Sequence, residues 1–177
     1  QAVQSLIRIG VGATDAVAAA LNPTNGYLRD RCLNVLARIN PERAVLVLLD
    51  ILGQGYGDRG ELQHVRQLAN VAADKVFAGI ESEDVKLRRA AARALAVYAT
   101  AYERGRLASK AQPPGEFGAQ RALELLLRAL KDSDAQARIN ALCSLERVAS
   151  FDPKALLPLD ESLRAALKDE NPEVRNR

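Results

Sequence analysis

The sequence predicts an all-α fold in which helix pairs stack in a row as a right-handed α-α superhelix of about four to five pairs. Three observations lead to this prediction. Hydrophobic residues make up 48% of the chain but aromatic residues only 4%, so the strong helix formers Ala and Leu supply most of the apolar content. The 11 Gly and 7 Pro fall mostly between runs of helical periodicity. A short phrase also recurs along the chain, as expected of stacked repeats.

The recurring phrase is an apolar or small residue, then Arg, then small or apolar residues. Its stripe falls at i, i+4 and i+7, which is one face of a helix. Leu87, Ala91 and Ala94 show the pattern clearly. The arginines of the successive copies lie 37, 22, 50 and 37 residues apart, and they are Arg29, Arg66, Arg88, Arg138 and Arg175.

A second column supports this alignment. Four positions before the Arg, most copies carry Asn or Asp, whose side chains accept hydrogen bonds from the first N–H groups of a helix. These predicted N-caps are Asn25, Asp84, Asp134 and Asn171. Only the copy at Arg66 lacks one, because Leu62 stands there.

Another apolar helix is expected before each cap, over residues 13–21, 41–52, 118–131 and 153–168. Residues 61–80 allow two interpretations, either one long helix or a break that leaves a very short helix over 74–80. The chain begins and ends inside repeats and contains no Met. We therefore expect residues 1–177 to form a single repeat domain that is open at both ends and belongs to a longer protein.

These phrases and the turns 131–134 and 168–172 resemble HEAT repeats, and most closely the bacterial HEAT-like type that also occurs in phycobilin lyases. The resemblance covers nearly the whole chain and is specific for fold alone. It implies that the second helix of each pair lines a concave surface. It also implies that a turn Asp and a helix Arg interact across repeats, a pattern that Asp132 with Arg138 and Asp169 with Arg175 match. Ser82 and Pro23 replace the acidic residue in earlier copies, so we expect an incomplete ladder.

Two irregular insertions interrupt the predicted stack, at about 53–60 and 102–118. The first is rich in Gly but lacks the Gly-Lys-Ser/Thr ending of a phosphate-binding loop, and no strand precedes it. An inter-helix loop is the favoured interpretation. The second insertion accounts for the spacing of 50 residues.

Catalytic and metal-binding residues are sparse. His64 is the only histidine, and we expect it to be exposed or to cap a helix, since a metal site or a catalytic triad requires partners for it. Cys32 and Cys143 each lie in an apolar helical pattern, where a reduced, structural thiol is favoured. We predict no catalytic residue, no cofactor and no metal, and a protein that is not an enzyme.

The candidate binding surface is the polar face of the second helices. After the apolar stripe is assigned to the core, its exposed positions carry an excess of Arg, which forms two-point contacts with carboxylate or phosphate groups. The candidate partner-binding residues are Arg31, Asn34, Arg38, Arg89, Arg93, Asn140 and Arg147.

The sequence therefore predicts a scaffold that holds an acidic segment of another protein against this face. One alternative is a phycobilin-lyase-like subunit that handles a chromophore, which only the repeat type supports. The other is binding along a nucleic-acid backbone, which the net charge of +3 makes the weakest of the three. No run approaches the roughly 20 apolar residues of a membrane span, so we expect a soluble, cytoplasmic protein.

Overall fold

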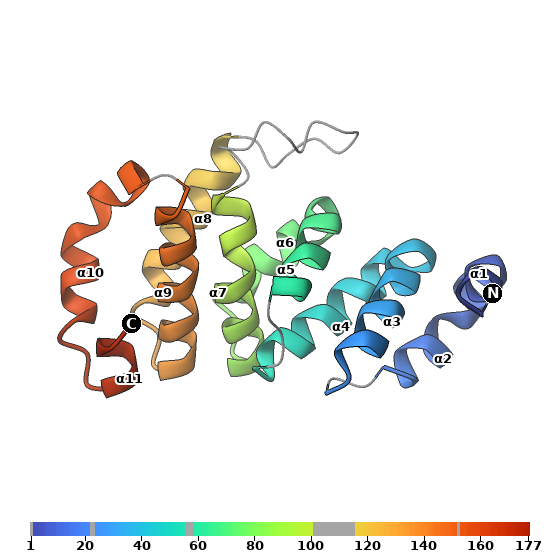
Figure 1. Ribbon diagram of the computed structural model, residues 1–177. Helices are drawn as coiled ribbons and strands as arrows, with labels where there is room; N and C mark the ends of the chain where they lie inside the picture. The colour runs from blue at the N-terminus through green and yellow to red at the C-terminus, as the bar shows by residue number, and fades with distance from the viewer. Residues whose placement is uncertain (1, 22–23, 56–58, 101–115, 152) are drawn as a thin grey trace.

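The computed structural model describes residues 2–21, 24–55, 59–100, 116–151 and 153–177. Their regular structure is all-α (Figure 1). The helices are α1 (Ala2–Ile9), α2 (Thr14–Ala19), α3 (Gly26–Ile39), α4 (Pro41–Gly53), α5 (Arg59–Gln67), α6 (Ala69–Gly79), α7 (Val85–Ala99), α8 (Glu116–Ala129), α9 (Ala135–Ala149), α10 (Asp160–Ala166) and α11 (Pro172–Arg175). Two 3-10 helices, Gly10–Ala13 and Pro153–Leu159, precede α2 and α10.

The helices follow one another in an elongated row, with α1 at one end and α10 at the other (Figure 1). Helix α7 is central to the packing, because it contacts α4, α5, α6, α8 and α9. Its sequence explains how five helices reach it. Ala90, Ala91, Ala92 and Ala94 are all fully buried, and such small side chains let neighbouring helices approach closely.

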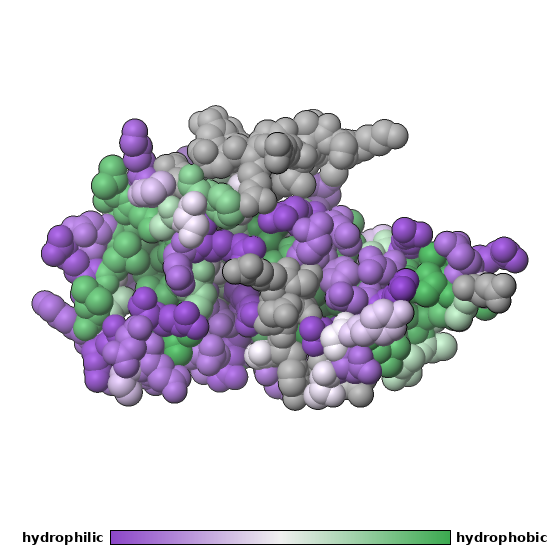
Figure 2. Space-filling model, viewed as in Figure 1, coloured by the Kyte–Doolittle hydropathy of each residue, from purple (hydrophilic) through white to green (hydrophobic). Residues whose placement is uncertain are grey.

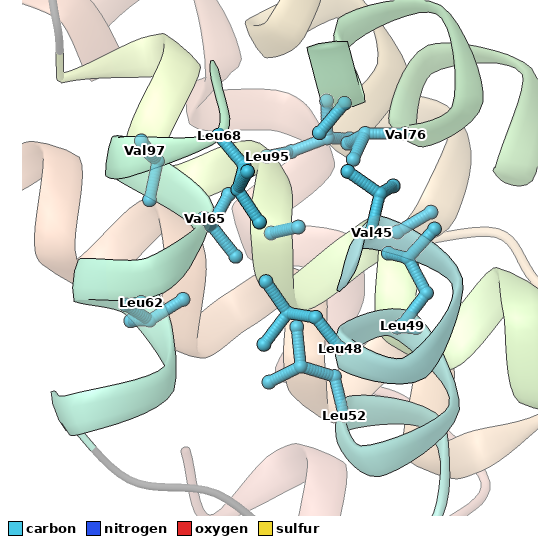
Figure 3. Close-up of a cluster of buried hydrophobic side chains, with 14 of the residues drawn as sticks. Val45, Leu48, Leu49, Leu52, Leu62, Val65, Leu68, Val76, Leu95 and Val97 are labelled. Atoms are coloured by element: carbon cyan, nitrogen blue, oxygen red, sulfur yellow. The ribbon is translucent and has the colours of Figure 1, made fainter. Parts of the chain in front are cut away.

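The apolar core continues from α7 through α4, α5 and α6 (Figure 3). Helix α4 turns one leucine-rich face toward the buried stripe of α5, and both stripes have helical spacing. The side chains of this cluster that Figure 3 labels are Val45, Leu48, Leu49, Leu52, Leu62, Val65, Leu68, Val76, Leu95 and Val97.

The predicted N-caps are confirmed. Asn25 Oδ1 accepts a hydrogen bond from the main-chain N–H of Leu28 at 3.1 Å. Asp84, Asp134 and Asn171 likewise accept from N–H groups in the first turns of α7, α9 and α11. These bonds satisfy donors that the helix itself leaves without a partner. They begin α3, α7, α9 and α11 at equivalent positions of the repeat.

Turn carboxylates tie neighbouring helix pairs together, and each one pairs with the arginine of the preceding pair. Arg88 Nε donates to Asp132 Oδ2 at 2.7 Å, and Arg138 Nη2 donates to Asp169 Oδ1 at 2.8 Å. The Arg of the same pair instead binds the main chain of the turn, as Arg138 Nη1 does at the carbonyl oxygen of Asp132. Arg88 and Arg138 thus each hold their own turn and the next one.

Ser82 takes the place of a turn carboxylate before α7 and retains only its local role. Its Oγ accepts from the N–H of Asp84 at 3.1 Å, as Asp132 Oδ1 does from the N–H of Asp134 at 2.8 Å. A hydroxyl carries no charge to pair with a guanidinium. As expected, Ser82 therefore supplies no ion pair to a neighbouring Arg. It does keep the hydrogen bond within its own turn.

Three of the four first-helix predictions agree with the structure, and the interval 153–168 is the exception. The interval 153–168 contains a 3-10 helix followed by the short α10 rather than one continuous helix. For residues 61–80 neither alternative is right, because the interval contains two helices that meet at Leu68, which has φ −100° and ψ 11°, and the second is α6 rather than a very short helix over 74–80. Neither Gly nor Pro marks this break. The Tyr98 hydroxyl donates to the carbonyl of Ala69 next to it, at 2.8 Å.

The Gly-rich segment 53–60 is partly explained by packing. Gly53 ends α4 against the main chain of Lys86 at the start of α7, where a Cβ would lie 2.9 Å from the Lys86 carbonyl carbon. Gly55 has φ +82°, a conformation that favours glycine. Residues 56–58, and residues 101–115 of the second insertion, lie outside the described residues. Residues 116–118 already belong to α8.

Candidate partner-binding face

The seven candidate residues divide into two groups that lie on different parts of the row. Helix α3 carries the first group, and the adjacent helices α7 and α9 carry the second. Helix α5 lies between them, since it contacts both α3 and α7. Within the second group Arg89 and Asn140 are in direct contact. The members of the first group are Arg31, Asn34 and Arg38, and those of the second are Arg89, Arg93, Asn140 and Arg147.

On α3 the three candidates are exposed, as expected. The guanidinium carbon of Arg31 lies 5.2 Å from the ring centroid of Tyr27, which is a cation–π contact on one helical turn. The Tyr27 side chain is itself 72% exposed. We did not expect Tyr27 at this site. Its spacing of four residues from Arg31, on a polar helix face, is the signal that indicates it.

Two of the candidates on α7 and α9, Arg89 and Asn140, form hydrogen bonds within the protein. Arg89 forms a two-point ion pair with Asp134, from Nε to Oδ1 at 2.8 Å and from Nη2 to Oδ2 at 2.7 Å. Asn140 Nδ2 donates to the main-chain carbonyl oxygen of Arg89 at 2.9 Å. The expectation that Asn140 is exposed is wrong, because it is 5% exposed. The close α7–α9 contact buries this position.

The charge of Arg89 is compensated at this contact. The hydrogen bond from Arg89 is the main reason that the pKa of Asp134 lies below its usual range. The same bond raises the pKa of Arg89. Asp134 also caps α9, so one carboxylate fixes both the start of α9 and the position of Arg89. A ligand carboxylate would have to displace it.

Arg93 and Arg147 are half-buried on α7 and α9. Arg147 lines a surface pocket of about 490 Å³ together with Cys143, Glu146, Ser150 and Phe151. This pocket brings a cation, an anion and an aromatic ring together at the C-terminal end of α9.

His64 stands on α5 and faces α3, and the structure corrects its expected exposure. It is 4% exposed, and its Nε2 lies 3.1 Å from Asp30 Oδ1. Burial follows from its place beside Leu62 and Val65, which α5 carries into the core. His64 thus links two second helices.

The described residues contain no group of three or more His, Cys, Asp or Glu side chains arranged to hold a metal ion. Cys32 and Cys143 are free thiols, and burial raises the pKa of Cys32. No described helix is both long enough and apolar enough to cross a membrane. Figure 2 shows a hydrophobic area near α10.

The chain matches no protein-family model, no curated protein and no solved structure. The resemblance to HEAT repeats therefore rests on the residues described above.

Proposed function

We propose that this chain is a HEAT-like α-solenoid that acts as a scaffold and binds an acidic segment of another protein through the polar face of its second helices. The repeated geometry supports the solenoid. The same cap begins α3, α7, α9 and α11, and the same Arg–carboxylate pair joins two successive turns. Stacked pairs of this kind form extended surfaces suited to binding macromolecules.

The observation that carries the binding role is the presence of exposed arginines that form no ion pair with a carboxylate of the described residues. Arg31 and Arg38 stand on α3 with an exposed amide, Asn34, between them. Exposed guanidinium groups recognise carboxylates through two parallel hydrogen bonds. Arg89 binds Asp134 in this way, and it shows within this protein the contact that a partner's carboxylate would make with α3.

Site-specific photocrosslinking tests the proposal. A photoreactive residue replaces Asn34 on second helix α3 or, as the matched control, Arg121 on first helix α8; both positions are exposed. We expect a crosslinked polypeptide from position 34 and none, or far less, from position 121. Crosslinking confined to position 121 would refute the assignment of the second-helix face.

The two alternative functions, chromophore handling and nucleic-acid binding, are tested with the purified protein. Chromophore handling requires a visible absorption band after incubation with a bilin. Nucleic-acid binding requires a gel shift at low salt that weakens steeply as salt increases. Either result, together with no crosslink at position 34, would replace the scaffold proposal.

A further inference from the structure

Four side chains on α3 form one straight strip, which we call the α3 strip: Tyr27, Arg31, Asn34 and Arg38. Successive members are 4, 3 and 4 residues apart, a spacing that keeps side chains on one side of a helix. All four are exposed. A second helix lying along α3 would meet each of them in turn.

Two of the four equivalent positions on α7, and one of the four on α9, are buried. Counting from the Arg of each phrase, the position of Arg31 corresponds to Ala90 on α7 and Asn140 on α9. Ala90 is fully buried, and Asn140 is buried too. The position of Arg38 corresponds to the buried Val97 on α7. The position of Arg31 is therefore covered on both α7 and α9 and that of Arg38 is covered on α7, whereas on α3 both positions are open.

The residues of the α3 strip differ from those at the buried positions of α7, and the difference indicates which kind of partner would bind here. Where α7 has Ala and Val, α3 has two arginines. The neighbouring acid, Asp30, faces His64, and the strip itself carries no carboxylate. An apolar helix would leave both guanidinium groups without an anionic partner, which is costly once water is excluded. An acidic helix would supply the missing carboxylates.

The spacing sets the pattern of that helix. Arg31 and Arg38 are seven residues apart, or about 10.5 Å along α3. A helix lying alongside presents side chains at the same separation from positions i and i+7. Tyr27 extends the strip by roughly one more turn and offers a ring face for an apolar side chain. An antiparallel helix would then place acids at i and i+7 and an apolar residue at i+11.

Building on the proposed function, we propose that the α3 strip is the docking site for an acidic amphipathic helix of the partner protein. The partner's carboxylates pair with Arg31 and Arg38, and its apolar residue covers Tyr27. Helices commonly dock on protein surfaces through anchors with this spacing.

The test uses the full chain and a synthetic 18-residue helical peptide with Glu at i and i+7 and Leu at i+11. Fluorescence anisotropy measures its binding to the wild type and to an Arg31→Glu/Arg38→Glu variant. We expect the double reversal to weaken binding at least about tenfold, because like charges then face each other. A Lys-for-Glu peptide should bind the reversed variant better than the wild type, and this rescue cannot come from misfolding.

Two controls make the result specific. Arg121→Glu, an exposed charge reversal on α8, should leave the peptide affinity unchanged. A peptide with the same composition but its Glu residues moved to i and i+5 should bind more weakly. Equal affinity of the two peptides, or of the wild type and the reversed variant, would overturn the proposal. So would a single-stranded oligonucleotide that binds more tightly than the peptide and depends on the same arginines.

The outcome also separates this inference from the proposed function. A crosslinked partner at position 34 with no dependence on Arg31 and Arg38 would leave the scaffold in place and remove the acidic helix. Absence of crosslinks at position 34 combined with peptide binding would remove the scaffold assignment in the cell while retaining the site's chemistry.

Discussion

Arg88 and Asp132 form a two-point ion pair between successive helix pairs, with Nε to Oδ2 at 2.7 Å and Nη2 to Oδ1 at 3.1 Å. Their side chains are 15% and 8% exposed. The remaining Nη1 of Arg88 donates to the carbonyl oxygens of Ser82 and Glu83. One guanidinium therefore connects two turns that are about 50 residues apart in the chain. Removing it would remove hydrogen bonds from both turns.

Replacing Asp132 with Ala should destabilise the protein by about 2 kcal/mol, because it leaves the largely buried charge of Arg88 without its carboxylate. The value is below that of a fully buried pair because some solvent reaches Arg88. Urea unfolding of the wild type, of Asp132→Ala, of Arg88→Ala and of the double variant gives the coupling energy between the two residues. Additive losses would show that the two residues do not stabilise each other.

The paired carboxylates also predict how stability responds to acid. Hydrogen bonds from Arg89 and Arg138 hold the pKa values of Asp134 and Asp169 below their usual range. An unfolded Asp has a pKa of about 3.9. The folded state therefore gains stability from these groups above about pH 4, and it loses that stability as pH falls through the lowered folded pKa.

Asp169→Asn removes one of these titrating groups, so the free energy of unfolding should fall less steeply as the pH decreases. The variant should be less stable than the wild type at pH 7, and the difference should shrink between pH 4 and pH 2.5. Urea midpoints across this range provide the measurement. A constant difference at all pH values would mean that the folded-state pKa of Asp169 is not lowered.

Gly53→Ala should destabilise the chain by about 2 kcal/mol, because the new Cβ overlaps the main chain of Lys86 and forces α4 away from α7. Gly12→Ala is the matched control. Its Cβ would meet only Ile9 Cγ2, at an ordinary 3.7 Å. Thermal unfolding should show a lower midpoint for the first variant than for the second, and equal midpoints would contradict the close α4–α7 contact.

Asn140 is buried and Asn34 is exposed, so replacing each with Ala should have different effects on stability. Asn140→Ala should cost about 1–2 kcal/mol, because the carbonyl of Arg89 loses its buried donor. Asn34→Ala, on the exposed strip of α3, should stay within about 0.5 kcal/mol of the wild type. Chemical unfolding of both variants measures the difference. A large loss for Asn34→Ala would show that the α3 strip is part of the fold rather than an open surface.

The candidate face was only partly predictable from the sequence. The positions of Arg31 and Arg38 on an exposed helix face follow from periodicity, since their neighbours Cys32, Val35 and Ile39 form the apolar stripe. The burial of Asn140 does not, because a polar residue beside an apolar stripe is normally exposed. It is covered because the small side chains of α7 bring α9 close enough for an amide to reach the carbonyl of Arg89.

The sequence by itself determined where most helices begin and which residues start them. A cap such as Asn25 or Asp134 accepts from an N–H two or three residues ahead, so the information is local. Only the tertiary structure decided the partners across the chain. Asp132 pairs with Arg88 because the α8–α9 turn lies beside the start of α7, and the burial of His64 and the break at Leu68 likewise follow from helix packing. Such contacts depend on the distances and angles between helices, which no short stretch of sequence contains.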